Sequence, residues 1–125
     1  MQLKIPKNTE KYEWTQHAII KMKQYGFTAQ RILRVIKNPQ RAEEGIVKNT
    51  IAVMQPSSFS TKDGKRTWNR EIWAMYQVKR KAKNANLKTL APQRIRLISA
   101  WRYSGVSPKR DPIPEDILSE IESLT

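Results

Sequence analysis

The chain has 125 residues, with 24 lysines and arginines against 11 aspartates and glutamates, and its formal net charge is +13. It has no cysteine and one histidine, which excludes a disulfide scaffold, a thiolate zinc site and a histidine-rich metal site, so we expect neither a metal nor a cofactor. No apolar run approaches the roughly 20 residues of a membrane-spanning helix, and no apolar signal core follows the start. We expect a single cytoplasmic domain without a membrane partner.

The N-terminal part of the chain is predicted to form a polar arm and then a helix. Residues 1–13 are mixed and polar, and Pro6 argues against regular structure there. The first helix is expected over residues 15–25, with Thr15 as its N-cap and Gly26 as the residue that ends it. Apolar residues recur on one face of this helix at Trp14, Ala18, Met22 and Tyr25.

A second helix is expected over residues 28–37. Thr28 is its cap, and the Asn38-Pro39 pair stops it, because the residue before a proline avoids helical angles. The apolar face consists of Ala29, Ile32, Leu33 and Ile36, and the outer face consists of Arg31, Arg34 and Lys37. Because only a few residues separate the two helices, the segment 14–39 is predicted to be a helical hairpin.

The middle of the chain is predicted to form a three-stranded antiparallel sheet, a meander within residues 46–103. The strands are expected over residues 46–55, 69–78 and 93–103, where apolar and polar residues alternate. The third strand would place Ile95, Leu97, Ser99 and Trp101 on one face and Arg94, Arg96, Ile98, Ala100 and Arg102 on the other. The expected fold class is α+β, with the helical hairpin packed on this sheet and a short C-terminal helix.

Two long basic loops interrupt the expected sheet. The loop 57–68 has a Lys-Asp-Gly-Lys tip, which is a good hairpin signal, and its Phe59 and Trp68 are candidates to stack on bases. The loop 79–92 carries five bases and no acid, which is typical of a mobile, solvated loop.

The C-terminal segment 111–125 has the opposite charge. It holds five acids and no bases, which leaves 24 bases and 6 acids in residues 1–110. A positive field of that size favours a polyanionic partner, so we expect RNA, with DNA as the alternative. The acidic segment is predicted to form an amphipathic helix over residues 113–124, which could cover one face of the sheet.

The first helices also carry a spaced pattern. It consists of His17-Ala18, Met22, Tyr25-Gly26-Phe27-Thr28, Ile32, Ile36 and Asn38-Pro39. It resembles the opening of small domains similar to the BrnT and RelE type of ribonuclease toxin, within the barnase–colicin–RelE-like fold group. The resemblance covers about residues 14–103, and the basic loops and acidic tail depart from it. It implies an α+β fold with a sheet facing nucleic acid, and metal-independent RNA cleavage or its inactive relic.

Metal-free RNA cleavage uses the 2′-hydroxyl of the RNA as nucleophile, and the protein supplies a base, an acid and positive charge. His17 titrates near neutral pH and is the candidate acid–base residue, with Lys21 one turn along the helix as a phosphate ligand. Arg102 and Tyr103 end the third strand, where a transition-state cation and a proton donor would be useful. Glu71, near the start of the second strand, is a candidate base.

In an antiparallel meander the start of the second strand and the end of the third lie at the same end of the sheet. We therefore expect Arg70, Glu71, Arg102 and Tyr103 to cluster. The candidate phosphate-binding residues are Lys21, Arg70, Lys79, Arg80, Lys81, Arg94 and Arg96. The structural alternatives are a hydrogen-bonding role for His17 and an ion pair of Glu71 with Arg94 or Arg96.

These observations favour an RNA-directed, toxin-like domain, which would be a metal-independent endoribonuclease if it is an enzyme. A non-catalytic nucleic-acid-binding module would use the same basic residues without needing His17. A third alternative is a toxin-like interaction component held by an antitoxin or another protein partner.

Overall fold

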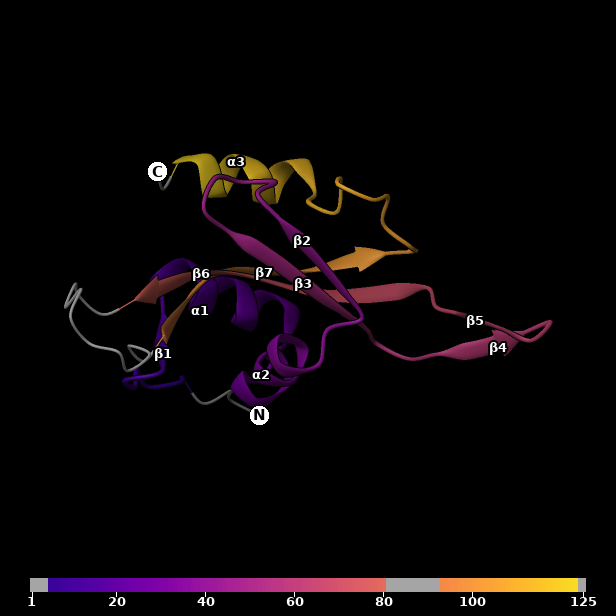
Figure 1. The fold of residues 1–125 in the computed structure, drawn as a ribbon, viewed down its shortest axis with the longest axis horizontal. Helices are drawn as coiled ribbons and strands as arrows, with labels where there is room; N and C mark the ends of the chain where they lie inside the picture. Colours follow the sequence, from indigo (N-terminus) through magenta and orange to yellow (C-terminus); the bar gives the residue numbers. More distant parts are fainter. Residues whose placement is uncertain (1–4, 81–92, 124–125) are drawn as a thin grey trace, which may run out of the picture.

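The computed structural model of the chain describes residues 5–80 and 93–123, and its architecture is α+β (Figure 1). The strands are β1 Tyr12–Trp14, β2 Arg41–Glu44, β3 Ile51–Pro56, β4 Ser60–Lys62, β5 Lys65–Thr67, β6 Arg70–Arg80 and β7 Gln93–Ser104. The helices are α1 Gln16–Tyr25, α2 Ala29–Lys37 and α3 Glu115–Ser123. No helix within the described ranges is long and apolar enough to cross a membrane.

The main sheet has five strands in the order β1-β7-β6-β3-β2, with β1 parallel to β7 and the other pairs antiparallel. The predicted meander is present as β3, β6 and β7, although β3 begins at Ile51 and residues 46–50 of the first predicted strand are not in a strand. The prediction of a three-stranded, all-antiparallel sheet is wrong. Two short strands extend it: β1 comes from the end of the expected arm and from Trp14, which the sequence predicts to belong to the helical hairpin, and β2 comes from the segment after Pro39. Strands of three and four residues are too short to show an alternating pattern in the sequence. These two segments are strands only because they pair with a neighbouring strand.

Both helix caps are as predicted. The Thr15 hydroxyl accepts a hydrogen bond from the Ala18 N–H at 3.2 Å, and the Thr28 hydroxyl accepts one from the Arg31 N–H at 3.1 Å. Gly26 ends α1 with a φ of 75°, a left-handed conformation that glycine adopts without steric cost.

The expected packing of the two helices as one hairpin is wrong. Helix α1 packs against β7, whereas α2 packs against β3 and β6. The difference arises at the edge of the sheet, where the pairing of β1 with β7 ends at Leu97. Thr15 then donates from its N–H to the Leu97 carbonyl at 3.2 Å and from its hydroxyl to the Ile98 carbonyl at 3.3 Å. Helix α1 thus follows the edge of β7 that β1 leaves open.

The sheet is covered on both faces, with α2 on one side and α3 on the other (Figure 1). One core contains Trp14, Ala18, Met22, Phe27, Ile32, Val35, Val53, Ile72, Ala74, Leu97 and Ala100. The other contains Ala52, Met54, Trp73, Met75, Trp101, Ile113, Ile117 and Ile121. The expectation that the acidic helix covers a sheet face is confirmed. Because Ile117 and Ile121 are buried, α3 is part of the core.

A β-bulge in β7 changes the faces predicted for that strand. Met75 pairs with Ser99 and Tyr76 with Leu97, so Ile98 has no partner on β6. The extra residue resets the alternation. Ala100 consequently lies in the same core as Leu97, against the prediction, and Trp101 lies in the other.

The hairpin predicted within residues 57–68 is confirmed as β4 and β5, a separate two-stranded sheet. Asp63 and Gly64 form its turn with φ angles of 54° and 76°, the positive values of a tight hairpin turn. The hairpin projects away from the main sheet (Figure 1). Of the second predicted loop, Lys79 and Arg80 belong to β6, and residues 81–92 lie outside the described part.

Candidate functional site

The pairing of β6 with β7 brings together the four residues expected at one end of the sheet. Arg70 is opposite Ser104, Glu71 is opposite Tyr103, and Arg102 is one position further along. However, alternation divides them between the two faces. Tyr103 packs on the core under α3, whereas the Arg102 guanidinium lies 5.0 Å from the centre of the Phe27 ring on the α2 side. The four therefore do not form one catalytic cluster.

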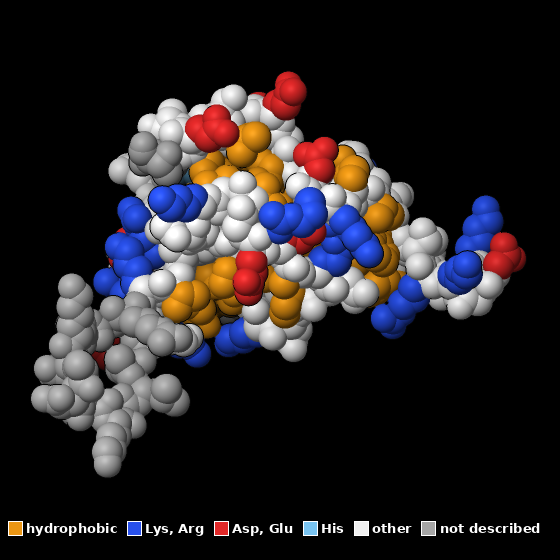
Figure 2. Space-filling view, turned by 45° about the horizontal axis from the view of Figure 1, so that its top comes forward, with side chains coloured by type: hydrophobic (Ala, Val, Ile, Leu, Met, Phe, Trp, Pro, Cys, Tyr) orange, Lys and Arg blue, Asp and Glu red, His pale blue; other side chains and the backbone are white. Residues whose placement is uncertain are grey.

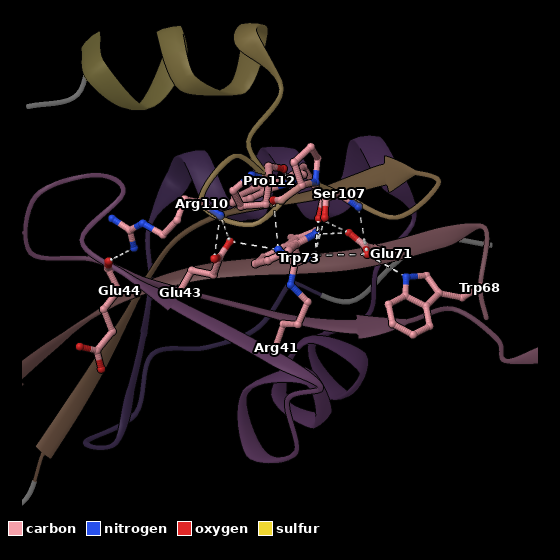
Figure 3. Close-up of polar contacts among 11 residues, drawn as sticks. Arg41, Glu43, Glu44, Trp68, Glu71, Trp73, Ser107, Arg110 and Pro112 are labelled. Atoms are coloured by element: carbon pink, nitrogen blue, oxygen red, sulfur yellow. Dashed lines mark hydrogen bonds and ion pairs between the residues drawn. The ribbon is translucent and has the colours of Figure 1, made fainter. Parts of the chain in front are cut away.

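Glu71 is fully buried and is surrounded by donors (Figure 3). Its Oε1 accepts hydrogen bonds from Trp73 Nε1 at 2.8 Å and from the Ser107 hydroxyl at 2.5 Å. Its Oε2 accepts from Trp68 Nε1 at 2.7 Å and from the Ser107 N–H at 3.3 Å, and Arg41 Nη1 lies 3.8 Å away. A carboxylate with these partners and no exposed surface positions other groups and has no access to a substrate proton.

Arg94 and Arg96 do not pair with Glu71, contrary to the structural alternative drawn from the sequence. Both contact Glu13 of β1, with Arg96 Nε at 2.8 Å and Arg94 Nη1 at 3.5 Å from its carboxylate oxygens. Two guanidinium groups thus share one carboxylate and retain a net positive charge beside the exposed Lys79. The side chain of Arg80 and the whole of Lys81 lie outside the described part of the structure.

His17 and Lys21 lie together, as the helical spacing predicts, and two residues from distant elements join them. His17 Nε2 is 3.1 Å from the Ser99 hydroxyl of β7 and 3.8 Å from Glu120 Oε2 of α3. Lys21 Nζ is 2.7 Å from the same Glu120 oxygen and also bonds Gln24. We call His17, Lys21, Ser99 and Glu120 the histidine cluster. Sequence reasoning missed the last two, because Ser99 lies 82 residues after His17 and Glu120 lies 99 residues after Lys21.

Burial controls the electrostatics of this cluster. It lowers the pKa of the His17 imidazole below its ordinary value; Glu120 opposes this effect, and Lys21 adds to it. Lys21 is only 4% exposed, so its ammonium group depends on Glu120 for charge compensation.

Tyr25 connects the histidine cluster with Arg102. Burial raises the pKa of the Tyr25 phenol, Lys21 lowers it, Asp116 and Glu120 raise it, and Arg102 lowers it, so the phenol lies within the field of all four charged groups. The Tyr25 carbonyl also accepts a hydrogen bond from Arg102 Nη2 at 3.2 Å. Helix α1 therefore extends from the histidine cluster to Arg102, near the end of β7.

A second group of cations lies beyond Arg102 on the α2 side. Burial lowers the pKa of Arg31, and the neighbouring guanidinium groups of Arg34 and Arg102 lower it further. Arg31 donates to the side chain of Gln55 and to the Pro56 carbonyl. We call Arg31, Arg34 and Arg102 the arginine surface.

No carboxylate in the described ranges forms an ion pair with the arginine surface, because the ion pairs found there use Glu13, Glu43, Glu71 and Glu120. The same ranges contain no group of three histidine, cysteine or acidic residues that could hold a metal ion. Sequence reasoning selected Arg102. The basic stripe on the second helix signalled Arg31 and Arg34, but only the fold brings Arg102 close enough to Arg31 to lower its pKa.

Replacing Glu71 with glutamine should destabilise the protein by about 2–4 kcal/mol, because an amide NH2 would face groups that are themselves donors. Urea unfolding of Glu71→Gln compared with wild type would measure this loss. The exposed Glu44 of β2 provides the control, since Glu44→Gln should change stability by less than about 0.5 kcal/mol. Equal stability of the two variants would contradict the structural role of Glu71.

The pKa of His17, followed by NMR, should lie below its ordinary value of about 6.5, and Glu120→Gln should lower it further by removing the carboxylate that raises it. Because the fold favours neutral His17, its contribution to stability is complete above about pH 6.5 and is lost as the pH falls through the lowered pKa. An unchanged or higher pKa in Glu120→Gln would contradict the proximity of the two groups.

Comparison of this chain with models of protein families, with curated protein sequences and with solved structures found no match.

Proposed function

We propose that this protein binds RNA through the arginine surface. The observation that carries the proposal is the gathering of Arg31, Arg34 and Arg102 without a carboxylate partner in the described ranges, close enough for the other two to lower the pKa of Arg31. Grouping like charges costs free energy, which a bound phosphate backbone offsets. Arginine is suited to this role because its planar fork binds phosphate with two hydrogen bonds.

Arg70 extends the arginine surface along the sheet. It lies two residues before Ile72 on β6, so both side chains project to the face that α2 covers. Arg102 is opposite Ile72 on the neighbouring strand, which places Arg70 and Arg102 diagonally on one face. Such a row of cations matches the repeated phosphates of a nucleic-acid chain.

RNA is preferred to DNA because the pattern from His17 to Pro39 resembles ribonuclease toxins. The overall charge of +13 supports either polyanion. A non-catalytic binding module is the simplest form of this proposal, because phosphate contacts alone give affinity without chemistry.

Arg34→Ala and Arg70→Ala should each weaken binding of a labelled single-stranded RNA about fivefold and reduce the salt slope of log K by about 0.7 to 1, because each removes one phosphate contact. Both residues are exposed, so the fold should be unaffected. Fluorescence anisotropy at several salt concentrations would measure both quantities. The control is Lys48→Ala, an exposed lysine between β2 and β3 at the other end of β3. Equal effects of Arg34→Ala and Lys48→Ala would count against the proposal.

Metal-independent RNA cleavage is a second candidate function, and the histidine cluster favours it. An imidazole nitrogen and an ammonium nitrogen both lie within 4 Å of one carboxylate oxygen there. Such a reaction needs groups of these kinds as acid, base and neutralising charge for the phosphate. The Glu120 side chain is 40% exposed, so its carboxylate is accessible in a way that Glu71 is not. Because burial favours the neutral imidazole, His17 would be the base that takes the proton of the 2′-hydroxyl, and the protonated imidazole would then return that proton to the leaving oxygen.

His17→Ala should abolish cleavage of labelled RNA in the presence of EDTA and leave RNA affinity within about twofold of wild type, because the arginine surface is intact. Denaturing gels would follow cleavage, and anisotropy would follow binding. Cleavage that persists in His17→Ala would remove His17 from the reaction. Salt-sensitive binding by wild type without any cleavage would leave the binding module as the function.

A further inference from the structure

The β4–β5 hairpin carries charge away from the body of the protein. All six strand residues are exposed, and lysine and arginine side chains mark its far end (Figure 2). Its root is fixed, because Trp68 donates its indole N–H to the buried Glu71. A ribbon that is held at its base and whose strand residues are all exposed presents side chains to a partner on both faces.

The register of the hairpin gives its two faces different chemistry. Ser60 pairs with Thr67 and Lys62 pairs with Lys65, and alternation puts these four on one face. That face therefore carries two ammonium groups directly opposite each other, an arrangement that is unfavourable unless bound anions compensate their charge. Asp63 in the turn is the only acid of residues 60–67, and neither lysine forms an ion pair within the described part of the chain.

On the other face of the hairpin Phe59 is 43% exposed, but two neighbouring side chains already contact its ring. The Arg66 guanidinium lies 4.3 Å from the centre of the Phe59 ring, and Trp68 meets that ring edge-on at 6.0 Å and 88°. These contacts count against the sequence-based hypothesis that Phe59 and Trp68 stack on bases. A single strand bound by base stacking requires free aromatic faces. The hairpin instead presents cations and hydroxyl groups, which contact phosphates and sugars.

We propose that the β4–β5 hairpin is an arm that lies in a groove of a double helix, with Lys62 and Lys65 contacting the phosphates that border it. This inference rests on the proposed function and specifies its ligand as base-paired nucleic acid. A two-stranded ribbon fits the major groove of B-form DNA, about 12 Å wide, and the shallow minor groove of A-form RNA is likewise open to it. The two rows of phosphates are common to both duplexes.

The test compares three labelled probes of matched sequence: a 20-base-pair RNA duplex, the corresponding DNA duplex and the single-stranded RNA. Anisotropy titrations would use wild type, Lys62→Ala/Lys65→Ala, Arg34→Ala and the control Lys48→Ala. The double variant should lose about tenfold in affinity for a duplex and about 2 in its salt slope, while its affinity for the single strand changes less than twofold. Thermal unfolding would show that these exposed substitutions leave the fold intact.

A loss of affinity for only one duplex would support the arm and identify the form of helix that it enters. A loss of affinity for both duplexes would support an arm that enters either form. An equal loss on duplex and single strand, or no loss on any probe, would overturn it. If Arg34→Ala weakens binding while the double variant does not, the arm proposal is rejected and the proposed function is retained. If wild type binds none of the probes, the proposed function itself is rejected.

Discussion

The buried carboxylate of Glu71 is the interaction on which this end of the molecule depends. Isolating a charge from water costs several kcal/mol, which its surrounding donors must offset. Those donors come from the root of the hairpin, from β6 and from the loop before α3, and Arg41 of β2 adds its guanidinium. Arg41 also lies over the Trp73 ring and bonds the Ser107 carbonyl at 2.7 Å. The contacts of Glu71 consequently hold these four segments in one fixed arrangement.

That arrangement fixes the surfaces to which we assign function. Trp68 follows the hairpin directly and Arg70 begins β6 two residues later, so the anchor at Glu71 sets the position of both. On the opposite side of the sheet, Gln55 of β3 bonds Arg31 and the carbonyls of Arg34 and Asn38, which holds α2 and its arginines at the end of the sheet. Cations that are held in place lose little entropy when they bind phosphate.

The charges of the folded chain are divided by location. Carboxylates pair with Lys21 beside α3, with Arg41 at β2 and with Arg94 and Arg96 at β1. The arginine surface and the hairpin form no ion pair in the described ranges, so no carboxylate there compensates their positive charge. An anionic ligand approaching the protein would therefore be attracted to both regions.

The sequence by itself determined the local elements of this protein. Thr15, Gly26 and Thr28 set the helix limits, Asp63-Gly64 set the hairpin turn, and alternation identified β3, β6 and β7, because caps, turns and periodicity act within a few residues. Tertiary structure alone decided the pairing of β1 and β2, the bulge at Ile98 and the partners of the candidate residues. Glu71 is the only acid within the three predicted strands, and only the fold surrounds it with donors. Glu120 reads as part of an acidic tail, and only the fold places it beside His17 and Lys21. Such contacts join residues far apart in the chain, and no local preference encodes them.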